Sequence, residues 1–214
     1  MIDSNINKIE KIINLNVSRE TLKELEDFSK SIILKNKSIN LISKTTENSI
    51  KQRHIEDSAQ TIDFIDKKDI QICTDLGSGA GLPGIVLGIL MKPKKPMLKL
   101  ILYEKSYHKS VFLKDMAKKF NLNSEIYQRD IFRERDLKTD VIITRAFKPL
   151  PVIFQIAQTN FKTYKYIIVF LGKRGKELLN DALKLWKFDY EKKKSTTNDE
   201  SVIVKISNLK KKNV

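Results

Sequence analysis

The sequence has very few of the residues that build disulfides and metal sites, with one cysteine and two histidines in 214 residues. A single cysteine cannot form a disulfide within the chain, and it cannot supply a cysteine-ligated metal site. Cys73 lies in a run of β-prone residues, where a small apolar side chain packs well in a core. We therefore expect no disulfide framework and no bound metal, and we interpret Cys73 as a core residue.

Long hydrophobic runs are also missing. The longest, near residues 85–91 and 166–171, are far shorter than the roughly 20 residues needed to span a membrane. The sequence starts with polar residues and shows no signal-peptide cleavage pattern. With 41% hydrophobic residues, the chain can still form a full core. We expect a cytoplasmic protein of one domain with a small appendage, which does not associate with a membrane.

Acidic residues are too few to balance the basic ones. The chain has 41 lysine and arginine residues against 26 acidic ones, which gives a net charge of +15. This balance favours a polyanionic partner such as nucleic acid, because cationic side chains release counterions from phosphates. A solvated lysine-rich surface is the alternative, and the excess of lysine over arginine leaves it open. The basic residues recur in clusters: Lys92, Lys94 and Lys95; Lys105, His108 and Lys109; Lys118 and Lys119; 192–194; 210–212.

Glycine is scarce as well, yet four of the seven glycines lie between residues 77 and 84. They follow a β-prone run that ends near Asp75, and an apolar segment begins at Pro83. Clustered glycines indicate a tight turn that a ligand approaches closely. Proline suits the first turn of a following helix, whose free N–H groups favour electronegative ligand groups. The pattern predicts a strand, a ligand-binding turn and a helix.

Two cofactors use such a turn, and the position of the glycines separates them. Gly79, Gly81 and Gly84 fit the dinucleotide spacing, but that frame starts several residues after the strand and leaves Gly77 unexplained. The frame Asp75-Leu76-Gly77-x-Gly79-x-Gly81 resembles motif I of the S-adenosyl-L-methionine-dependent methyltransferases with a Rossmann-like fold. A glycine-rich turn that binds nothing is the remaining alternative. We favour the methyltransferase frame.

Motif I implies how the cofactor is held. Gly77, Gly79 and Gly81 would leave room for its methionine end, and Asp75 would lie near its amino group. A second acid is expected at the end of the next strand, where it would accept the ribose hydroxyls. Glu104 is in that place.

The first 68 residues contain no glycine or proline and have a helical pattern of apolar residues. We expect one helix with Ile2, Ile6, Ile9 and Ile13 on one face, a second that starts at Ser18 as N-cap, and a third over 46–65. The domain boundaries that we predict are a helical extension at 1–68, a Rossmann-like domain at 69–208, and a frayed basic tail at 209–214.

Strands and helices alternate from Ile70 onward, which predicts an α/β fold with a mostly parallel sheet. The strands are expected at 70–76, 98–104, 124–128, 140–145 and 166–171. The helices are expected at 83–91, 108–120, 148–161 and 175–186. A turn-rich segment at 195–200 joins the last two strands, at 187–193 and 201–206, which predicts a C-terminal antiparallel hairpin.

Four further segments resemble those of one methyltransferase family. They are Asn40-Leu41-Ile42-Ser43, Arg53-His54-Ile55-Glu56-Asp57-Ser58, Thr144-Arg145-Ala146-Phe147 and Phe170-Leu171-Gly172-Lys173. With the GSGAGLPG run at 77–84, they are similar to the 16S ribosomal RNA guanine-N7 methyltransferases, also called the glucose-inhibited division protein B family. The resemblance covers nearly the whole chain, including the helical extension.

The resemblance implies a set of site residues. Besides motif I and Glu104, cofactor contacts are implied at Leu82, Asp130, Ile131 and Arg145. The glutamate replaces the usual aspartate of the family at the ribose position.

Catalytic positions are implied at His54, Asp57, Arg145 and Lys173. The sequence departs from the family pattern at two places. The Lys-Gly pair of the family appears here within Gly172-Lys173-Arg174-Gly175, which leaves the register of Lys173 ambiguous, and His108 stands after Glu104 where lysine is common in the family. Two simpler readings stay open: His54 and Asp57 form a local helical pair, or Arg145 is a surface cation at a strand end.

The same resemblance implies methylation of a guanine N7 in 16S ribosomal RNA, free or within an assembling small subunit. We expect the protein to be a monomer. Guanine N7 has an exposed lone pair, so the reaction needs alignment but no base to remove a proton. The chain has no Asp/Asn-Pro-Pro-Tyr segment to hold an exocyclic amine, and Cys73 is badly placed for 5-methylcytosine chemistry. The rival functions are a small-molecule methyltransferase and a non-catalytic RNA-binding or ribosome assembly factor.

Overall fold

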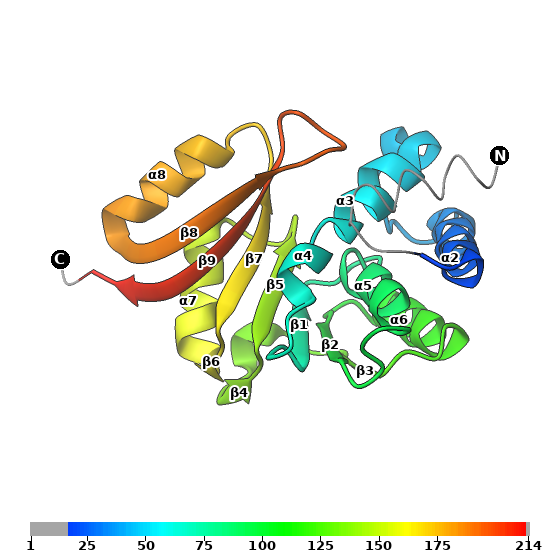
Figure 1. Ribbon diagram of the computed structural model, residues 1–214, viewed down its shortest axis with the longest axis horizontal. Helices are drawn as coiled ribbons and strands as arrows, with labels where there is room; N and C mark the ends of the chain where they lie inside the picture. The colour runs from blue at the N-terminus through cyan, green and yellow to red at the C-terminus, as the bar shows by residue number, and fades with distance from the viewer. Residues whose placement is uncertain (1–16, 213–214) are drawn as a thin grey trace.

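The computed structural model describes residues 17–212, so the expected helix with Ile2, Ile6, Ile9 and Ile13 lies outside the described residues. A seven-stranded sheet with the order β3-β2-β1-β5-β7-β9-β8 forms its centre (Figure 1). All neighbouring pairs are parallel except β7–β9 and β9–β8. The sheet consists of β1 Ile72–Leu76, β2 Lys99–Tyr103, β3 Ser124–Tyr127, β5 Val141–Arg145, β7 Tyr166–Leu171, β8 Trp186–Lys194 and β9 Val202–Lys211.

Helices cover both faces of the sheet. They are α2 Arg19–Asn36, α3 Asp57–Ala59, α4 Ile62–Ile65, α5 Gly84–Met91, α6 Tyr107–Lys119, α7 Leu150–Asn160 and α8 Gly175–Leu185. A short pair, β4 Leu137–Lys138 and β6 Phe161–Thr163, lies outside the main sheet, and a 3₁₀ turn, η3, spans Ile131–Arg133. The expected Rossmann-like fold is confirmed.

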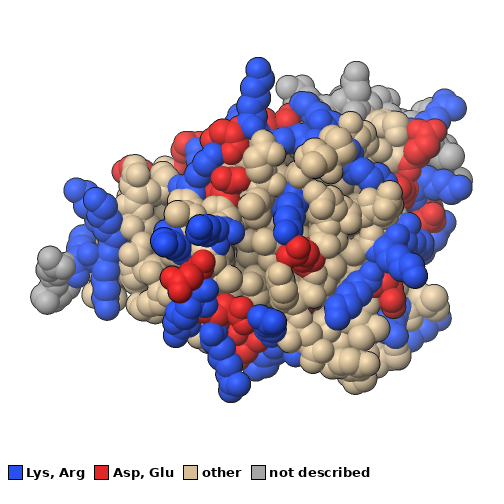
Figure 2. All heavy atoms as spheres, turned by 90° about the horizontal axis from the view of Figure 1, so that it is seen from below, with Lys and Arg blue, Asp and Glu red and all other residues tan. Residues whose placement is uncertain are grey.

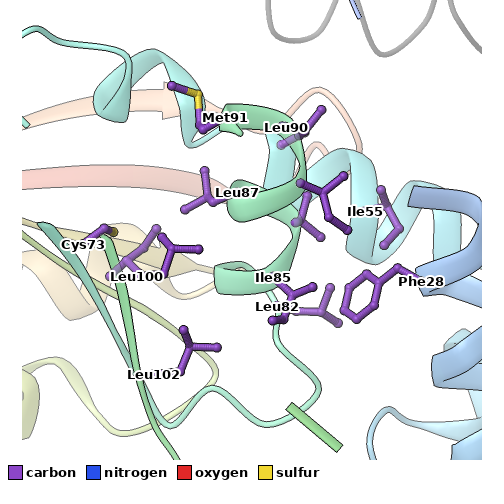
Figure 3. Packing of buried hydrophobic residues seen from close by; sticks show 14 of the residues in the cluster. Phe28, Ile55, Cys73, Leu82, Ile85, Leu87, Leu90, Met91, Leu100 and Leu102 are labelled. Carbon is purple, nitrogen blue, oxygen red and sulfur yellow. The ribbon is translucent and has the colours of Figure 1, made fainter. Parts of the chain in front are cut away.

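Side chains alternate between two cores along the central strands. In β5, Val141 and Ile143 pack into the core under α2, α5 and α6, whereas Ile142 packs into the core under α7 and α8. This alternation follows from the two-residue period of a strand, and both faces are apolar because helices cover both. Figure 3 shows Phe28 of α2 beside Ile85 of α5 in the first core.

The helical extension is less regular than the sequence predicts. Ser18 caps α2 as expected, because its Oγ accepts from the N–H of Thr21 at 3.2 Å. The prediction of a single helix over 46–65 is wrong. Four short elements follow one another there instead: a 3₁₀ turn (η1, Lys44–Ser49), a π-helical turn (η2, Lys51–Glu56), α3 and α4. Side-chain hydroxyl groups donate hydrogen bonds to nearby backbone carbonyls at these breaks; the hydroxyl of Thr61, for example, donates to the carbonyl oxygen of Ser58 at 2.7 Å. Such hydrogen bonds compete with the backbone hydrogen bonds of a regular helix.

The C-terminal hairpin is longer than expected. Strand β9 continues to Lys211 and pairs there with Trp186, so residues 209–211 do not fray as the sequence suggested. In Figure 1 the turn between β8 and β9 reaches across the sheet toward α3. The hairpin and the extension, which are far apart in sequence, therefore meet near the carboxyl ends of the parallel strands.

Candidate active site

The glycine turn leaves β1 in a left-handed backbone conformation. Gly77, Gly79 and Gly81 have φ values of +67°, +54° and +84°, which residues with a Cβ rarely adopt. At Gly77 a Cβ would lie 2.1 Å from Cδ2 of Phe147, so this position also requires glycine for space. The sequence alone predicts this turn, because its glycines are necessary for the backbone path.

The turn borders a cavity of about 550 Å³ where β1 and β5 meet and the strand order changes direction. Open α/β sheets bind ligands at this point. The cavity brings together eight predicted residues: His54, Gly77, Gly79, Leu82, Glu104, Asp130, Ile131 and Arg145. Four other predicted residues, namely Asp75, Gly81, Asp57 and Lys173, are not part of its lining.

Glu104 is held at the end of β2 by two backbone N–H groups. Its Oε2 accepts from Gly79 at 2.9 Å and its Oε1 accepts from Ser106 at 2.8 Å. A carboxylate offers about four acceptor sites, so both oxygens keep capacity for a ligand. Glu104 thus ties the glycine turn to β2 and still faces the cavity.

The third strand contributes a small fixed turn. Asp130 accepts from the N–H of Phe132 at 3.2 Å, which caps the short 3₁₀ turn η3. This arrangement buries Ile131 at the cavity wall and leaves Phe132 exposed beside it. Asp130 and Ile131 thus present one polar and one apolar side chain to the cavity, which suits the edge and the face of a heteroaromatic ring.

Asp75 is buried and is not part of the cavity wall. Its Oδ2 accepts from the N–H of Gly84 at 3.0 Å, at the start of α5, and a Cβ on Gly84 would lie 2.7 Å from that oxygen. Its Oδ1 is buried and has no hydrogen-bond partner among the described residues. Burial raises the pKa of Asp75 to about 7. The predicted contact with a cofactor amino group therefore stays a prediction.

Arg145, at the end of β5, is directed by three groups of the extension. Its Nη2 lies 3.0 Å from Oδ2 of Asp57 and 2.6 Å from the carbonyl oxygen of Arg53, and its Nη1 lies 3.4 Å from Oγ of Ser58. The guanidinium also lies over the ring of Phe170, 5.4 Å from its centroid. A simple surface cation would not have these contacts, and the observed Arg145 is mostly buried.

His54 and Asp57 do not form the simple helical pair. The Nε2 of His54 lies 2.9 Å from the Thr46 hydroxyl, while Asp57 pairs with Arg145. Burial lowers the pKa of His54 to about 4, and the nearby Arg145 cation adds to this effect. At neutral pH the imidazole is therefore uncharged.

Lys173 lies outside the cavity in this structure. Its side chain is 80% exposed and its Nζ is 3.3 Å from Oε1 of Glu200. The catalytic role that the resemblance implies for it stays a prediction.

Several residues at the cavity mouth are not among the site residues that the sequence predicts, although Lys105 and Lys109 belong to one of its basic clusters. Lys105, Lys109, Arg129 and Lys148 line the mouth, and Phe147 fills the space over Gly77. Lys105, Arg129 and Lys148 closely follow the ends of β2, β3 and β5, whereas Lys109 lies in the first turn of α6. Position after a strand end was the available signal for the first three, because strand ends converge at this edge of the sheet. Figure 2 shows one face of the molecule, on which lysine and arginine side chains are widely distributed with smaller groups of acidic side chains between them. The mouth carries the positive charge expected for a polyanionic ligand.

Neither a metal site nor a membrane span is seen in residues 17–212. No three His, Cys, Asp or Glu side chains in this part of the chain form a cluster that could hold a metal ion. No helix of the described residues is long and apolar enough to cross a membrane.

Comparison with known proteins shows a close family relationship. Residues 21–205 match the family described as rRNA small subunit methyltransferase G. The "Ribosomal RNA small subunit methyltransferase G" of Pelagibacter ubique is 46% identical over 202 residues, which cover 94% of each chain. The protein of the same name from Rickettsia felis is 36% identical, over 92% of this chain and 98% of its own.

A solved structure supports the fold. A SAM dependent methyltransferase from Aquifex aeolicus matches 76% of this chain and 94% of its own with a TM-score of 0.56, at 15% identity. At that identity the likeness concerns the architecture of the sheet and its helices alone.

Proposed function

Because this chain belongs to the ribosomal RNA small subunit methyltransferase G family, we propose that it methylates N7 of one guanine in 16S ribosomal RNA with S-adenosyl-L-methionine. The observation that carries the proposal is the cavity at the strand crossover, where the glycine turn, the Glu104 carboxylate and Arg145 face one space. Such a protein works where ribosomal subunits are assembled, so we place it in the cytoplasm. We propose that it acts as a monomer.

The cavity fits S-adenosyl-L-methionine in size and in chemistry. Its volume lies within the roughly 300–1,000 Å³ usual for small-molecule sites. Glu104 would accept the ribose hydroxyls, while Asp130 and Ile131 would take the edge and face of the adenine. The turn at Gly77 and Gly79 would border the methionine end. The cofactor supplies an electrophilic methyl group when bound.

The residues of this chain need only to align the target base. Guanine N7 carries a lone pair and no proton, so no general base is required. The uncharged His54 is consistent with this chemistry, since a neutral imidazole can donate one hydrogen bond without adding positive charge beside a sulfonium. Arg145 would donate to the guanine or to an adjacent phosphate at the cavity mouth.

The basic mouth would hold the RNA. Lys105, Lys109, Arg129 and Lys148 surround the opening, where phosphates that flank an exposed guanine would pass. A base inside folded RNA must leave its stack to reach such a cavity, and cationic and aromatic groups at the rim would stabilise it there.

The first experiment measures methyl transfer to 16S RNA that lacks the modification, both free and in small subunits. Labelled S-adenosyl-L-methionine reports transfer, and chemical cleavage at 7-methylguanosine maps the nucleotide. We expect one labelled site. Gly77→Asp should abolish cofactor binding in calorimetry, because its side chain would collide with Phe147 and fill the turn; circular dichroism checks that the variant is folded.

The outcomes separate the rival functions. Cofactor binding without RNA labelling, together with RNA affinity that is absent or insensitive to salt, would favour a small-molecule methyltransferase. RNA binding without cofactor heat would favour a non-catalytic assembly factor. Full activity of Gly77→Asp would mean that the cofactor site is elsewhere.

A further inference from the structure

The turn between β8 and β9 makes specific contacts with a carboxylate at the proposed active site. The hydroxyl groups of Ser195 and Thr197 each donate to Oδ1 of Asp57 at 2.9 Å. The other oxygen of the same carboxylate, Oδ2, is the one that pairs with Arg145 at 3.0 Å. A chain of direct contacts therefore links the hairpin turn to the arginine, across 138 and 140 residues of sequence between the hydrogen-bonded partners.

The turn is fastened to the extension at two other points. Gln60, which is fully buried, accepts the N–H of Thr196 through Oε1 at 2.8 Å, and its Nε2 lies 3.3 Å from Oδ1 of Asp57. Lys193 of β8 pairs with Asp63. These contacts place Ser195 and Thr197 in a fixed position over Asp57.

The energetics of a buried charge pair explain why the two hydroxyls matter. Asp57 and Arg145 are both largely removed from water, and such a pair is stable only when hydrogen bonds satisfy its remaining donors and acceptors. Ser195 and Thr197 provide two of these bonds on Oδ1. They thereby fix the plane of the carboxylate and the direction of Oδ2, on which the guanidinium of Arg145 rests.

We propose that Ser195 and Thr197 are positioning residues for the reaction, which act through Asp57 to aim the Arg145 guanidinium at the base and phosphate that enter the cavity. This inference rests on the proposed function, because it assigns to Arg145 a contact with the RNA. It extends the site to the C-terminal hairpin, whose turn the sequence marks only as a connection.

The test compares Ser195→Ala/Thr197→Val with Thr196→Val, a control in the same turn. The control is matched because the Thr196 side chain is exposed and only its backbone N–H bonds to Gln60. We expect the double variant to lose roughly tenfold in kcat on RNA, with the KM for S-adenosyl-L-methionine changed less than twofold. Thr197→Ser, which keeps the hydroxyl, should retain activity, and Thr196→Val should match the wild type.

A double-mutant cycle distinguishes positioning from general support of the fold. In an Arg145→Ala background, loss of the two hydroxyls should change kcat less than twofold, because the group on which they act is gone. An equal loss in both backgrounds would overturn the proposal, as would equal kcat values for the double variant and Thr196→Val.

A measurement that does not depend on methyl transfer keeps this result separate from the proposed function. The Nε–H resonance of Arg145, assigned by its disappearance in Arg145→Ala, should shift in the double variant and stay in place in Thr196→Val. An unchanged resonance would overturn the proposal even if the enzyme is active. A shifted resonance in a protein that does not methylate RNA would leave the positioning of Arg145 intact and reject the RNA function alone.

Discussion

At the scale of single residues, Asp75 shows how a motif residue can serve the fold beneath a site. Its carboxyl bonds to the N–H of Gly84 at the start of α5, so it holds the glycine turn against the helix. The other oxygen is buried without a partner among residues 17–212, which disfavours the charged form. In the protein without ligand, the burial of this carboxylate therefore lowers the stability whenever Asp75 is ionised.

The stability of the ligand-free protein should depend on the ionisation of Asp75. Burial raises its pKa from 3.8 to about 7, so its contribution to stability is full below about pH 4 and is lost as pH rises through 7. Asp75→Asn keeps an oxygen for Gly84 but cannot ionise. We expect its stability relative to the wild type to rise by about 2 to 3 kcal/mol between pH 5 and pH 8, in urea unfolding experiments.

The comparison with the wild type removes the effect of His54, which has the opposite sign. Its pKa is lowered to about 4, so the stability that it contributes is lost as pH falls from about 6.5 toward 4. Parallel stability curves for the wild type and Asp75→Asn would show that Asp75 ionises normally.

At the scale of elements, the extension is an integral part of the methyltransferase core. Phe28 of α2 is fully buried, and its ring lies 6.5 Å from that of Phe112 and 6.1 Å from that of Phe120, both in or next to α6. Segments η1 and η2, which follow α2, carry Thr46 and His54 to the cavity side. The extension should therefore not separate from the sheet without unfolding.

Phe28→Ala should cost about 3 to 5 kcal/mol of unfolding free energy, because it leaves a cavity between α2 and α6. Leu34→Ala is the control on the same helix, since Leu34 is 69% exposed and its loss should change stability by less than about 0.5 kcal/mol. Urea unfolding measures both. Similar midpoints for the two variants would mean that the extension is not packed on the domain.

The elements also mark what the sequence can and cannot predict. The strands were predictable because short apolar runs bounded by turn residues rarely adopt a structure other than a buried strand. The turn at Gly77 was predictable because its backbone conformation requires glycine. The continuous helix over 46–65 was wrong, because local hydroxyl bonds such as that of Thr61 override the apolar period. The contact of Asp57 with the hairpin was unpredictable, since nothing local to either segment indicates it.

At the scale of the whole molecule, the net charge of +15 is spread widely, and the cavity mouth is one of its concentrations. A widely basic surface attracts RNA from any direction, whereas the mouth lies where the phosphates beside a bound guanine would be. Binding should therefore have a steep salt dependence to which the mouth residues contribute individually.

Lys105→Ala should weaken RNA binding and reduce the slope of log affinity against log salt by about 0.7 to 0.9, the effect of one phosphate contact. Lys184→Ala is the control, because Lys184 lies on α8, is exposed and pairs with Asp181. Filter binding at several salt concentrations gives both slopes. Equal slopes for the two variants would place the RNA away from Lys105.

The position of β9 has a consequence for the newly synthesised chain. Translation makes β9 after every other strand of the sheet, yet β9 lies inside the sheet, between β7 and β8. Until the ribosome has added Val202–Lys211, β7 has an open edge and β8 has no partner, so the turn at Ser195 has no frame to hold it over Asp57. If Ser195 and Thr197 position Arg145 as proposed, a nascent chain that already contains the whole glycine turn still lacks the two hydrogen bonds on Asp57 that direct this arginine. Arg145 would then reach its proposed alignment only after β9 has paired with both β7 and β8.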